Sequence, residues 1–279
     1  MPYQQKKIHP VAFTRTVLHN ARALEALTMQ LVVTLTSRDA IEVMARLPRI
    51  NIANIPQHIV QIGHNNLNCF FDDEDYEFYL ASLKKSAQQY DVDIHAYVLL
   101  PNAIQIIATP NIPQGISSMM QSLGRRYVQY VNHRYQRSGT LWAGRYKSSV
   151  IDSDAYLLTC YRYVELKPMY EGIVDGPELY PWSSFNYHTC RKKSDIIVDH
   201  RLYMDLGETK EERGNEYSAL FRFRFDRMLL DYIAETIKLG QVLGGDQFTE
   251  KIEQIANHRV RPLKRGRPKK KKSTEPTSP

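Results

Sequence analysis

The residues whose arrangement is most suited to chemistry lie in a predicted β-hairpin at residues 97–109. Two apolar, β-branched runs meet at Pro101 and Asn102, a pair typical of a turn, so the second strand is expected to begin near Ala103. Side chains alternate between the faces of a strand, which puts Ala103 and Gln105 on the same face. Histidines at both positions would suit a divalent cation for phosphate chemistry. This chain has a methyl group and a neutral amide there instead.

A second group of residues favours nucleic acid as a partner. From Ile94 to Ile151 the chain has no Asp or Glu, whereas cationic side chains alternate with aromatic ones. The cationic residues are Arg125, Arg126, Arg134, Arg137, Arg145 and Lys147, and the aromatic residues are Tyr127, Tyr130, Tyr135, Trp142 and Tyr146. Because Arg binds phosphates and rings stack on unpaired bases, this pattern predicts contact with single-stranded or hairpin DNA. The alternative is an ordinary solvated face.

The net charge of +7 is concentrated in the last residues of the chain. From Arg259 onward there are nine Lys or Arg and one Glu, so the preceding residues carry 28 positive and 29 negative side chains, a balance of −1. Residues 264–270 (KRGRPKK) resemble an AT-hook, in which Gly lets the backbone approach a narrow minor groove and Arg lies along its floor. Its core would be Arg265, Gly266, Arg267 and Pro268. A generic polybasic tail that binds any polyanion is equally compatible, and in either case the tail is expected to contact duplex DNA.

Composition excludes several other classes. With 43% hydrophobic residues and no apolar run of the ~18 residues that a bilayer requires, the chain is predicted to be globular and not membrane-bound. No signal peptide is expected. Cys69, Cys160 and Cys190 form no Cys-x-x-Cys pair, which argues against a disulfide framework and a zinc ribbon and favours a cytoplasmic, nucleoid-associated protein. Nothing in the sequence predicts the oligomeric state.

Hydrophobic periodicity predicts the elements that must position these residues. Alternation favours a strand at 57–63, an amphipathic helix follows to about residue 90, and the hairpin spans 94–109. Helical spacing from Ile116 to Val131, a strand at 145–151 and a helix from 152 to Pro168 complete the order. This order predicts an α+β fold, namely a ferredoxin-like split βαβ antiparallel sheet with helices on one face.

The rest of the chain is expected to add appendages to this fold. Residues 44–190 are predicted to be the DNA-binding core, and 1–43 an extension that is not genuine if Met44 is the true start. Helices at about 216–238 and 246–257 suggest a small helical appendage over 191–258. Residues 259–279 are Pro- and Lys-rich without apolar periodicity and form the basic tail.

Six segments together resemble one family. They are residues 58–63 (HIVQIG), 71–76 (FDDEDY), 95–102 (HAYVLLPN), 120–127 (MQSLGRRY), 139–148 (GTLWAGRYKS) and 180–184 (YPWSS). In this order they resemble the REP-associated tyrosine transposases, which are single-tyrosine transposases with a His-hydrophobe-His motif. The resemblance extends from about Met44 to His188.

The resemblance implies a nucleophile and a metal site. The nucleophile would be Tyr163, with an unshifted phenol pKa near ~10; in the family it attacks a DNA phosphate and becomes joined to the 5′ end of the cut strand. The family's Mg²⁺ or Mn²⁺ is held by two strand histidines and a polar residue one helical turn after the tyrosine. Those ligand positions correspond here to Ala103, Gln105 and Lys167. An ammonium group does not coordinate a metal, so we expect no bound metal cofactor.

Two further histidines could substitute for missing ligands. Alternation along the hairpin puts His95 on the face opposite Gln105, so it is an unsuitable substitute. His58, on the first strand, is the better candidate, although a half-buried structural role is the simpler interpretation.

Three functions stay open from the sequence. The first is a DNA-binding protein of the transposase family with lost or severely reduced nicking activity. The second is an active metal-dependent transposase that forms a 5′-phosphotyrosine link through Tyr163 with substitute ligands. The third is a protein-interaction module, against which the basic stretch and the AT-hook-like tail argue. The sequence therefore does not decide whether the protein is an enzyme.

Overall fold

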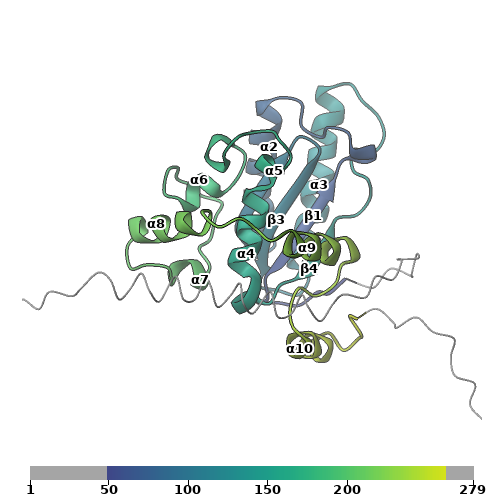
Figure 1. Cartoon of the computed structure of the whole chain (residues 1–279). Helices are drawn as coiled ribbons and strands as arrows, with labels where there is room; N and C mark the ends of the chain where they lie inside the picture. Colours follow the sequence, from purple (N-terminus) through teal and green to yellow (C-terminus); the bar gives the residue numbers. More distant parts are fainter. Residues whose placement is uncertain (1–48, 262–279) are drawn as a thin grey trace, which may run out of the picture.

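Four antiparallel strands form the centre of the structure, a computed structural model that describes residues 49–261 (Figure 1). They are β1 (Gln57–Ile62), β2 (Val92–Leu100), β3 (Ala103–Pro110) and β4 (Lys147–Val150). Their order across the sheet is β2-β3-β1-β4, and each pair is antiparallel. The predicted ferredoxin-like, α+β fold is thereby confirmed.

Two long helices cover one face of the sheet. Helix α2 (Asp73–Gln89) begins with a capping box, in which Asp72 accepts from the backbone of Asp75 and the Asp75 carboxylate accepts in return from Asp72. Helix α3 (Gly115–Arg134) packs beside it. The apolar side chains that meet here include Ile59, Leu99, Ile104 and Ile106 of the sheet with Tyr79, Leu83, Met119 and Leu123 of the helices.

The opposite face is covered as well, which corrects the expectation of helices on one face only. Helix α4 (Ser153–Glu165) packs against β2 and β3, and helix α9 (Arg227–Leu239) packs against β1 and β4. Val98 and Ile107 of the sheet share a cluster with Val164 of α4 and Ile233 of α9. The alternate apolar residues of β2 and β3 are buried on both sides, and a strand buried on both faces needs cover on both.

The segments after α4 are short, and one predicted helix is broken. The segments are α5 (Lys167–Tyr170), a 3₁₀ turn (Pro177–Leu179), α6 (Phe185–His188), α7 (Arg201–Met204), α8 (Lys210–Leu220) and α10 (Asp246–Ala256). The helix predicted at 216–238 is two helices, α8 and α9, because residues 221–226 leave the helical path. Asp226 then caps α9 by accepting from the backbone N–H of Met228.

The outer edge of β2 is occupied by the chain itself. Leu99 donates to the carbonyl of Trp182, and Val198 donates to the carbonyl of Ile94. Tyr97 donates its backbone N–H to Ser184 Oγ and accepts from the Ser184 backbone N–H. The segment around residues 182–198 therefore fixes the edge of the sheet.

Some sequence predictions concern residues that the structure does not describe. The N-terminal extension and the AT-hook-like residues 265–268 lie outside residues 49–261. Within 49–261, no helix combines the length and apolar character needed to span a bilayer.

Candidate functional site

The positions singled out by the family resemblance come together on the sheet face that α4 covers. Ala103 and Gln105 lie on β3, opposite Ile62 and Val60 of β1. Tyr163 lies on α4 above them, and Lys167 begins α5 after a break at Leu166. Pro168 sits in the first turn of α5, where its missing N–H leaves no gap in the hydrogen bonding. The expected contact between residues 163 and 167 is thus present although two helices carry them.

Gln105 is held by His58 of β1. The His58 ring donates from Nε2 to the Gln105 Oε1 atom at 2.9 Å, and both side chains are buried. Burial is the main cause that lowers the pKa of His58 to about 3, and nearby Lys167 lowers it further while the Gln105 bond opposes the shift. The imidazole is therefore neutral at neutral pH, and its buried Nδ1 has no hydrogen-bond partner.

The environment of Tyr163 disfavours its phenolate form. Its side chain is 6% exposed, and its ring meets the His58 ring edge-on with centroids 5.8 Å apart. Burial raises the pKa of Tyr163 to about 12, and Cys160, Glu171 and Asp231 add to the shift. The sequence predicted an unshifted phenol, so this shift is a correction. At neutral pH a smaller fraction of Tyr163 is deprotonated to the phenolate than in a free tyrosine.

Lys167 brings a positive charge to Tyr163. Its Nζ atom lies 5.3 Å from the centre of the Tyr163 ring and 3.7 Å from the Glu171 carboxylate. A cation over the face of an aromatic ring is attracted by the ring quadrupole. A phosphate near Tyr163 would therefore meet an ammonium group rather than a metal ligand.

The residues present do not fit the Mg²⁺ or Mn²⁺ that the family uses. Ala103 has no donor atom, the Gln105 oxygen accepts from His58, and Lys167 is cationic. Both ions favour several oxygen ligands, and the bare Nδ1 of His58 is a single nitrogen. Across residues 49–261, no group of three His, Cys, Asp or Glu side chains is arranged to hold a metal ion.

His95 lies on the same sheet face as Gln105, which corrects the predicted orientation. A register shift between Ile94 and Ala96 interrupts the alternation of β2 at His95. Its Nε2 accepts from the Thr109 hydroxyl at 2.8 Å, and its Nδ1 donates to the Val198 carbonyl at 2.7 Å. Thr109 is four residues from Gln105 along β3, or about 13 Å, so His95 does not reach the site.

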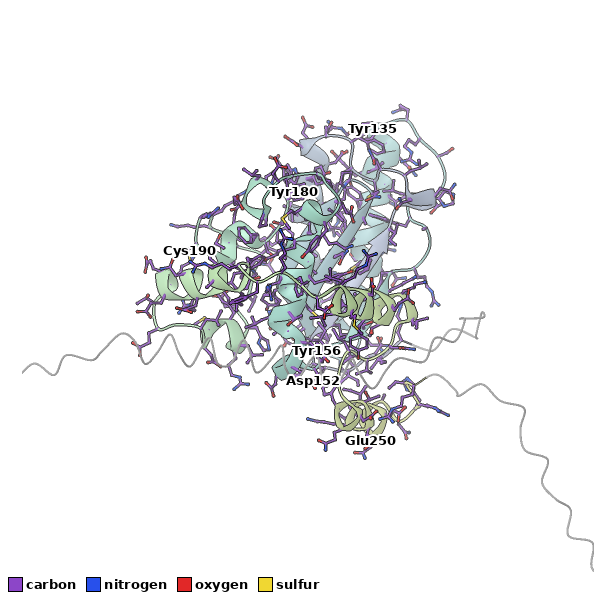
Figure 2. All side chains as sticks on the ribbon, viewed as in Figure 1. Tyr135, Asp152, Tyr156, Tyr180, Cys190 and Glu250 are labelled. Carbon is purple, nitrogen blue, oxygen red and sulfur yellow. The ribbon has the colours of Figure 1, made fainter. Side chains whose placement is uncertain are left out.

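The predicted basic surface is divided between the two sides of the sheet. Arg125, Arg126, Arg134 and Arg137 belong to α3 or follow it, on the side away from Tyr163. Arg134 is neutralised by α2, because it pairs with Asp72 at 2.6 Å, with Glu74, and with Asp75 at 3.9 Å. The stretch has no acidic residue near Arg134 in sequence, but the fold brings acidic residues from the start of α2 next to it. Tyr135, which also bonds to Asp72 and Asp75, lies at the end of the molecule opposite Asp152 and Tyr156 (Figure 2).

The aromatic residues between these arginines are not free for base stacking. Trp142 is 7% exposed and its ring lies 6.0 Å from that of Tyr127, which is itself buried. Tyr146 is also buried, and Tyr130 stacks on Phe78 at 3.8 Å. The predicted stacking platform on the core is therefore a set of packing residues.

Lys147 is a predicted cation that the sheet register places on the face of the site. Lys147 pairs with Val60 on one side of β1, and Gln105 pairs with Val60 on the other. Directly paired residues share a face, so Lys147 projects toward the face of Gln105 and Tyr163, two strand spacings or roughly 10 Å from Gln105. Arg145 precedes this strand and is exposed.

Sequence reasoning missed the buried carboxylate of Glu165, which lies on α4 two residues before Lys167. It accepts hydrogen bonds from Ser184 at 2.5 Å, His188 at 2.7 Å and Tyr217 at 2.7 Å. These contacts hold α4 against α6 and α8. The signal that could have revealed it is the acidic residue at a helix position between the apolar Val164 and Leu166.

Comparison with known proteins identifies the domain. Residues 51–167 match the family model described as "Transposase IS200 like". Residues 51–167 are therefore an IS200-like transposase domain, which agrees with the resemblance seen in the sequence.

Two solved structures are similar to the chain. One is a REP-associated tyrosine transposase bound to a REP hairpin, with 18% identity over 57% of this chain and 96% of that chain and a TM-score of 0.47. The other is a putative transposase from Deinococcus radiodurans R1, with 16% identity over 45% of this chain and 95% of that chain and a TM-score of 0.30. No curated protein matches the chain.

Proposed function

We propose that this protein binds single-stranded or hairpin DNA at the nucleoid and has lost metal-dependent nicking through Tyr163. Within the IS200-like family, its motifs favour the REP-associated group. The observation that carries the proposal is the composition of the site. Ala103, Gln105 and Lys167 surround Tyr163 without a set of ligands, and Gln105 is bonded to His58 instead.

The same site is suited to holding a phosphate. Lys167 lies beside Tyr163, and Lys147 projects toward the same sheet face. Two ammonium groups would attract a DNA backbone. Without a Lewis acid to polarise the phosphate, and with the pKa of Tyr163 raised to about 12, attack by the phenol is disfavoured. Binding without cleavage is the result.

Covalent adduct formation tests this proposal. We expect the natural chain to bind a DNA hairpin without requiring Mg²⁺ or Mn²⁺ and to give no protein–DNA adduct on a denaturing gel. The combined changes Ala103→His, Gln105→His and Lys167→Asn restore the family's ligand types on the same face. They are expected to give metal-dependent adduct formation, which Tyr163→Phe in that background abolishes.

An adduct from the unmodified chain that disappears with Tyr163→Phe would refute the loss of activity and establish the active transposase. Absence of hairpin binding by the natural chain would refute the DNA-binding function itself. The restored variant must unfold at the same temperature as the natural chain, so that a failure to react is not a failure to fold.

A further inference from the structure

The connector between α8 and α9 alternates aromatic and basic residues. Residues 221–225 read Phe-Arg-Phe-Arg-Phe, and we call this segment the basic strap. Its three phenylalanines are partly buried, whereas Arg222 and Arg224 are exposed. The strap therefore has an apolar side against the protein and a cationic side toward solvent.

The phenylalanine side of the basic strap is fixed to α4 by Arg162. The Arg162 guanidinium lies 4.3 Å from the centre of the Phe225 ring and donates to the Phe223 carbonyl at 2.6 Å. At the other end, Phe221 meets Phe185 edge-on at 4.8 Å. Figure 1 shows the connector running across α4 from α8 to α9. The residue that anchors the strap, Arg162, is thus the direct neighbour of the candidate nucleophile in the chain.

The outward side of the strap carries charge that no described carboxylate neutralises. Arg222 and Arg224 make no ion pair within 4.0 Å among residues 49–261, in contrast to Arg134 on α3. Both are therefore available to a polyanion.

An exposed ring completes this surface. Tyr170, at the end of α5, is 45% exposed. Partial burial is the main cause that raises the pKa of Tyr170, and Arg162, the Phe225 backbone and Arg224 act in the opposite direction. Lys167 begins the same short helix. Tyr170 thus interacts with the end of the strap that carries Arg224 and Phe225, and Arg222 lies two residues before Arg224 on the exposed side of the strap.

We propose that Tyr170, Arg222 and Arg224 bind the single-stranded flank of a DNA hairpin whose stem is held by the transposase domain. The proposal rests on the proposed function and names a second part of its interface. An exposed ring beside guanidinium groups suits unpaired bases, which can stack on it while the arginines contact phosphates. A hairpin without a flank offers Tyr170 no unpaired base at the foot of its stem.

Binding of matched DNA probes tests this inference. One probe is a hairpin with a flank of about ten thymidines, within the site sizes of single-strand binders, and the other is the same hairpin without a flank. Arg222→Ala with Arg224→Ala is expected to weaken binding of the flanked hairpin about tenfold and to leave the blunt hairpin unchanged. The slope of log affinity against log salt should decrease by about 1.4, because each phosphate that an arginine neutralises on a single strand contributes about 0.7.

Two controls separate position from charge. Lys192→Ala with Lys193→Ala removes two exposed cations from the connector after α6, and we expect no loss on either probe. Tyr170→Ala should weaken binding of the flanked hairpin, whereas Tyr170→Phe should retain it because the ring remains. The arginine and lysine variants should unfold at the temperature of the natural chain, since these side chains are exposed. The unfolding temperature of Tyr170→Ala is compared with that of Tyr170→Phe, because the Tyr170 ring is partly buried.

Equal losses on both probes, or the same loss from the lysine pair, would show a general charge effect and overturn the inference. Full binding by the arginine variant would also overturn it and would leave an acidic protein as the partner of the strap. In each of these cases the natural chain still binds the hairpin, so the proposed function is unaffected. If the natural chain binds neither probe, the proposed function fails first.

Discussion

The imidazole ring of His58, which is hydrogen-bonded to Gln105, is ionisable and fully buried. The pKa of His58 is about 3 and that of His95 about 4, mainly because burial disfavours the charged ring. In the unfolded chain both rings return to a pKa near 6.5. Folding therefore excludes protons that the unfolded chain would take up at mildly acidic pH. The stability that these two residues contribute is complete above about pH 6.5 and is lost as the pH falls toward 4 and 3.

This linkage predicts a measurable acid sensitivity. Below pH 6, each excluded proton lowers the free energy of unfolding by about 1.4 kcal/mol for each pH unit of acidification. The two histidines together therefore lower it by roughly 2.8 kcal/mol per pH unit. The unfolding free energy is measured by urea titration between pH 6 and pH 5. His58→Gln should reduce its slope against pH by the contribution of about one proton, or about 1.4 kcal/mol per pH unit. His64→Gln, at an exposed position, serves as the control and should leave the slope unchanged. If His58→Gln and the natural chain had the same slope of unfolding free energy against pH, His58 would not be a buried, neutral imidazole in the folded protein.

Among the elements, α4 has the most demanding position because it carries Tyr163 on one side and Glu165 on another. Glu165 is 0% exposed and accepts from Ser184, His188 and Tyr217. A buried carboxylate is tolerated only when such donors compensate for its lost hydration. These contacts fix the orientation of α4 on the sheet, and therefore the position of the Tyr163 ring over His58.

Removal of this carboxylate should destabilise the fold strongly. Glu165→Ala leaves three buried donors without their acceptor, and we expect a loss of about 3–5 kcal/mol in urea unfolding. Glu171→Ala is the matched control, because its carboxylate is more exposed and lies 3.7 Å from Lys167, so its loss should be below about 1 kcal/mol. Similar losses from both changes would contradict a special role for the buried network.

The elements also show which features a sequence can predict. The strands, α2, α3 and α10 were predicted because caps and periodicity are local signals, as with Asp72 at the start of α2. The break at 221–226 was not predicted, since its phenylalanines are held by Arg162 and Phe185, which are distant in sequence. The prediction of the His95 orientation was wrong because a register shift between Ile94 and Ala96 interrupts the alternation of side chains along β2. The roles of Tyr163 and the three ligand positions rest on family motifs and stay predictions, whereas the acids beside Arg134 required the fold.

At the scale of the whole molecule, charge is separated between a nearly neutral body and a basic tail. The residues before Arg259 carry a balance of −1, whereas those from Arg259 onward carry +8. Deletion of residues 259–279 removes nine cations and should flatten the salt dependence of duplex binding, by about 0.9 in slope for each phosphate that the tail no longer neutralises. An unchanged slope would mean that the tail does not bind DNA.

Two pairs of substitutions distinguish an AT-hook from a generic basic tail. Arg265→Ala with Arg267→Ala removes the arginines of the AT-hook-like core, and Lys271→Ala with Lys272→Ala removes an equal charge outside it. An AT-hook predicts that only the arginine pair abolishes the preference for A·T-rich over G·C-rich duplex. Equal losses from both pairs, without a change in preference, would indicate a generic polybasic tail.

The covered edge of β2 affects how copies of this protein interact when they are concentrated. A protein that gathers on DNA reaches high local concentration, and open sheet edges then promote aggregation by adding strands from one molecule to another. Here Ile94, Tyr97 and Leu99 already use their outward backbone groups within the chain, through Val198, Ser184 and Trp182. Copies of this chain that meet at high concentration therefore find no template for strand addition at this edge.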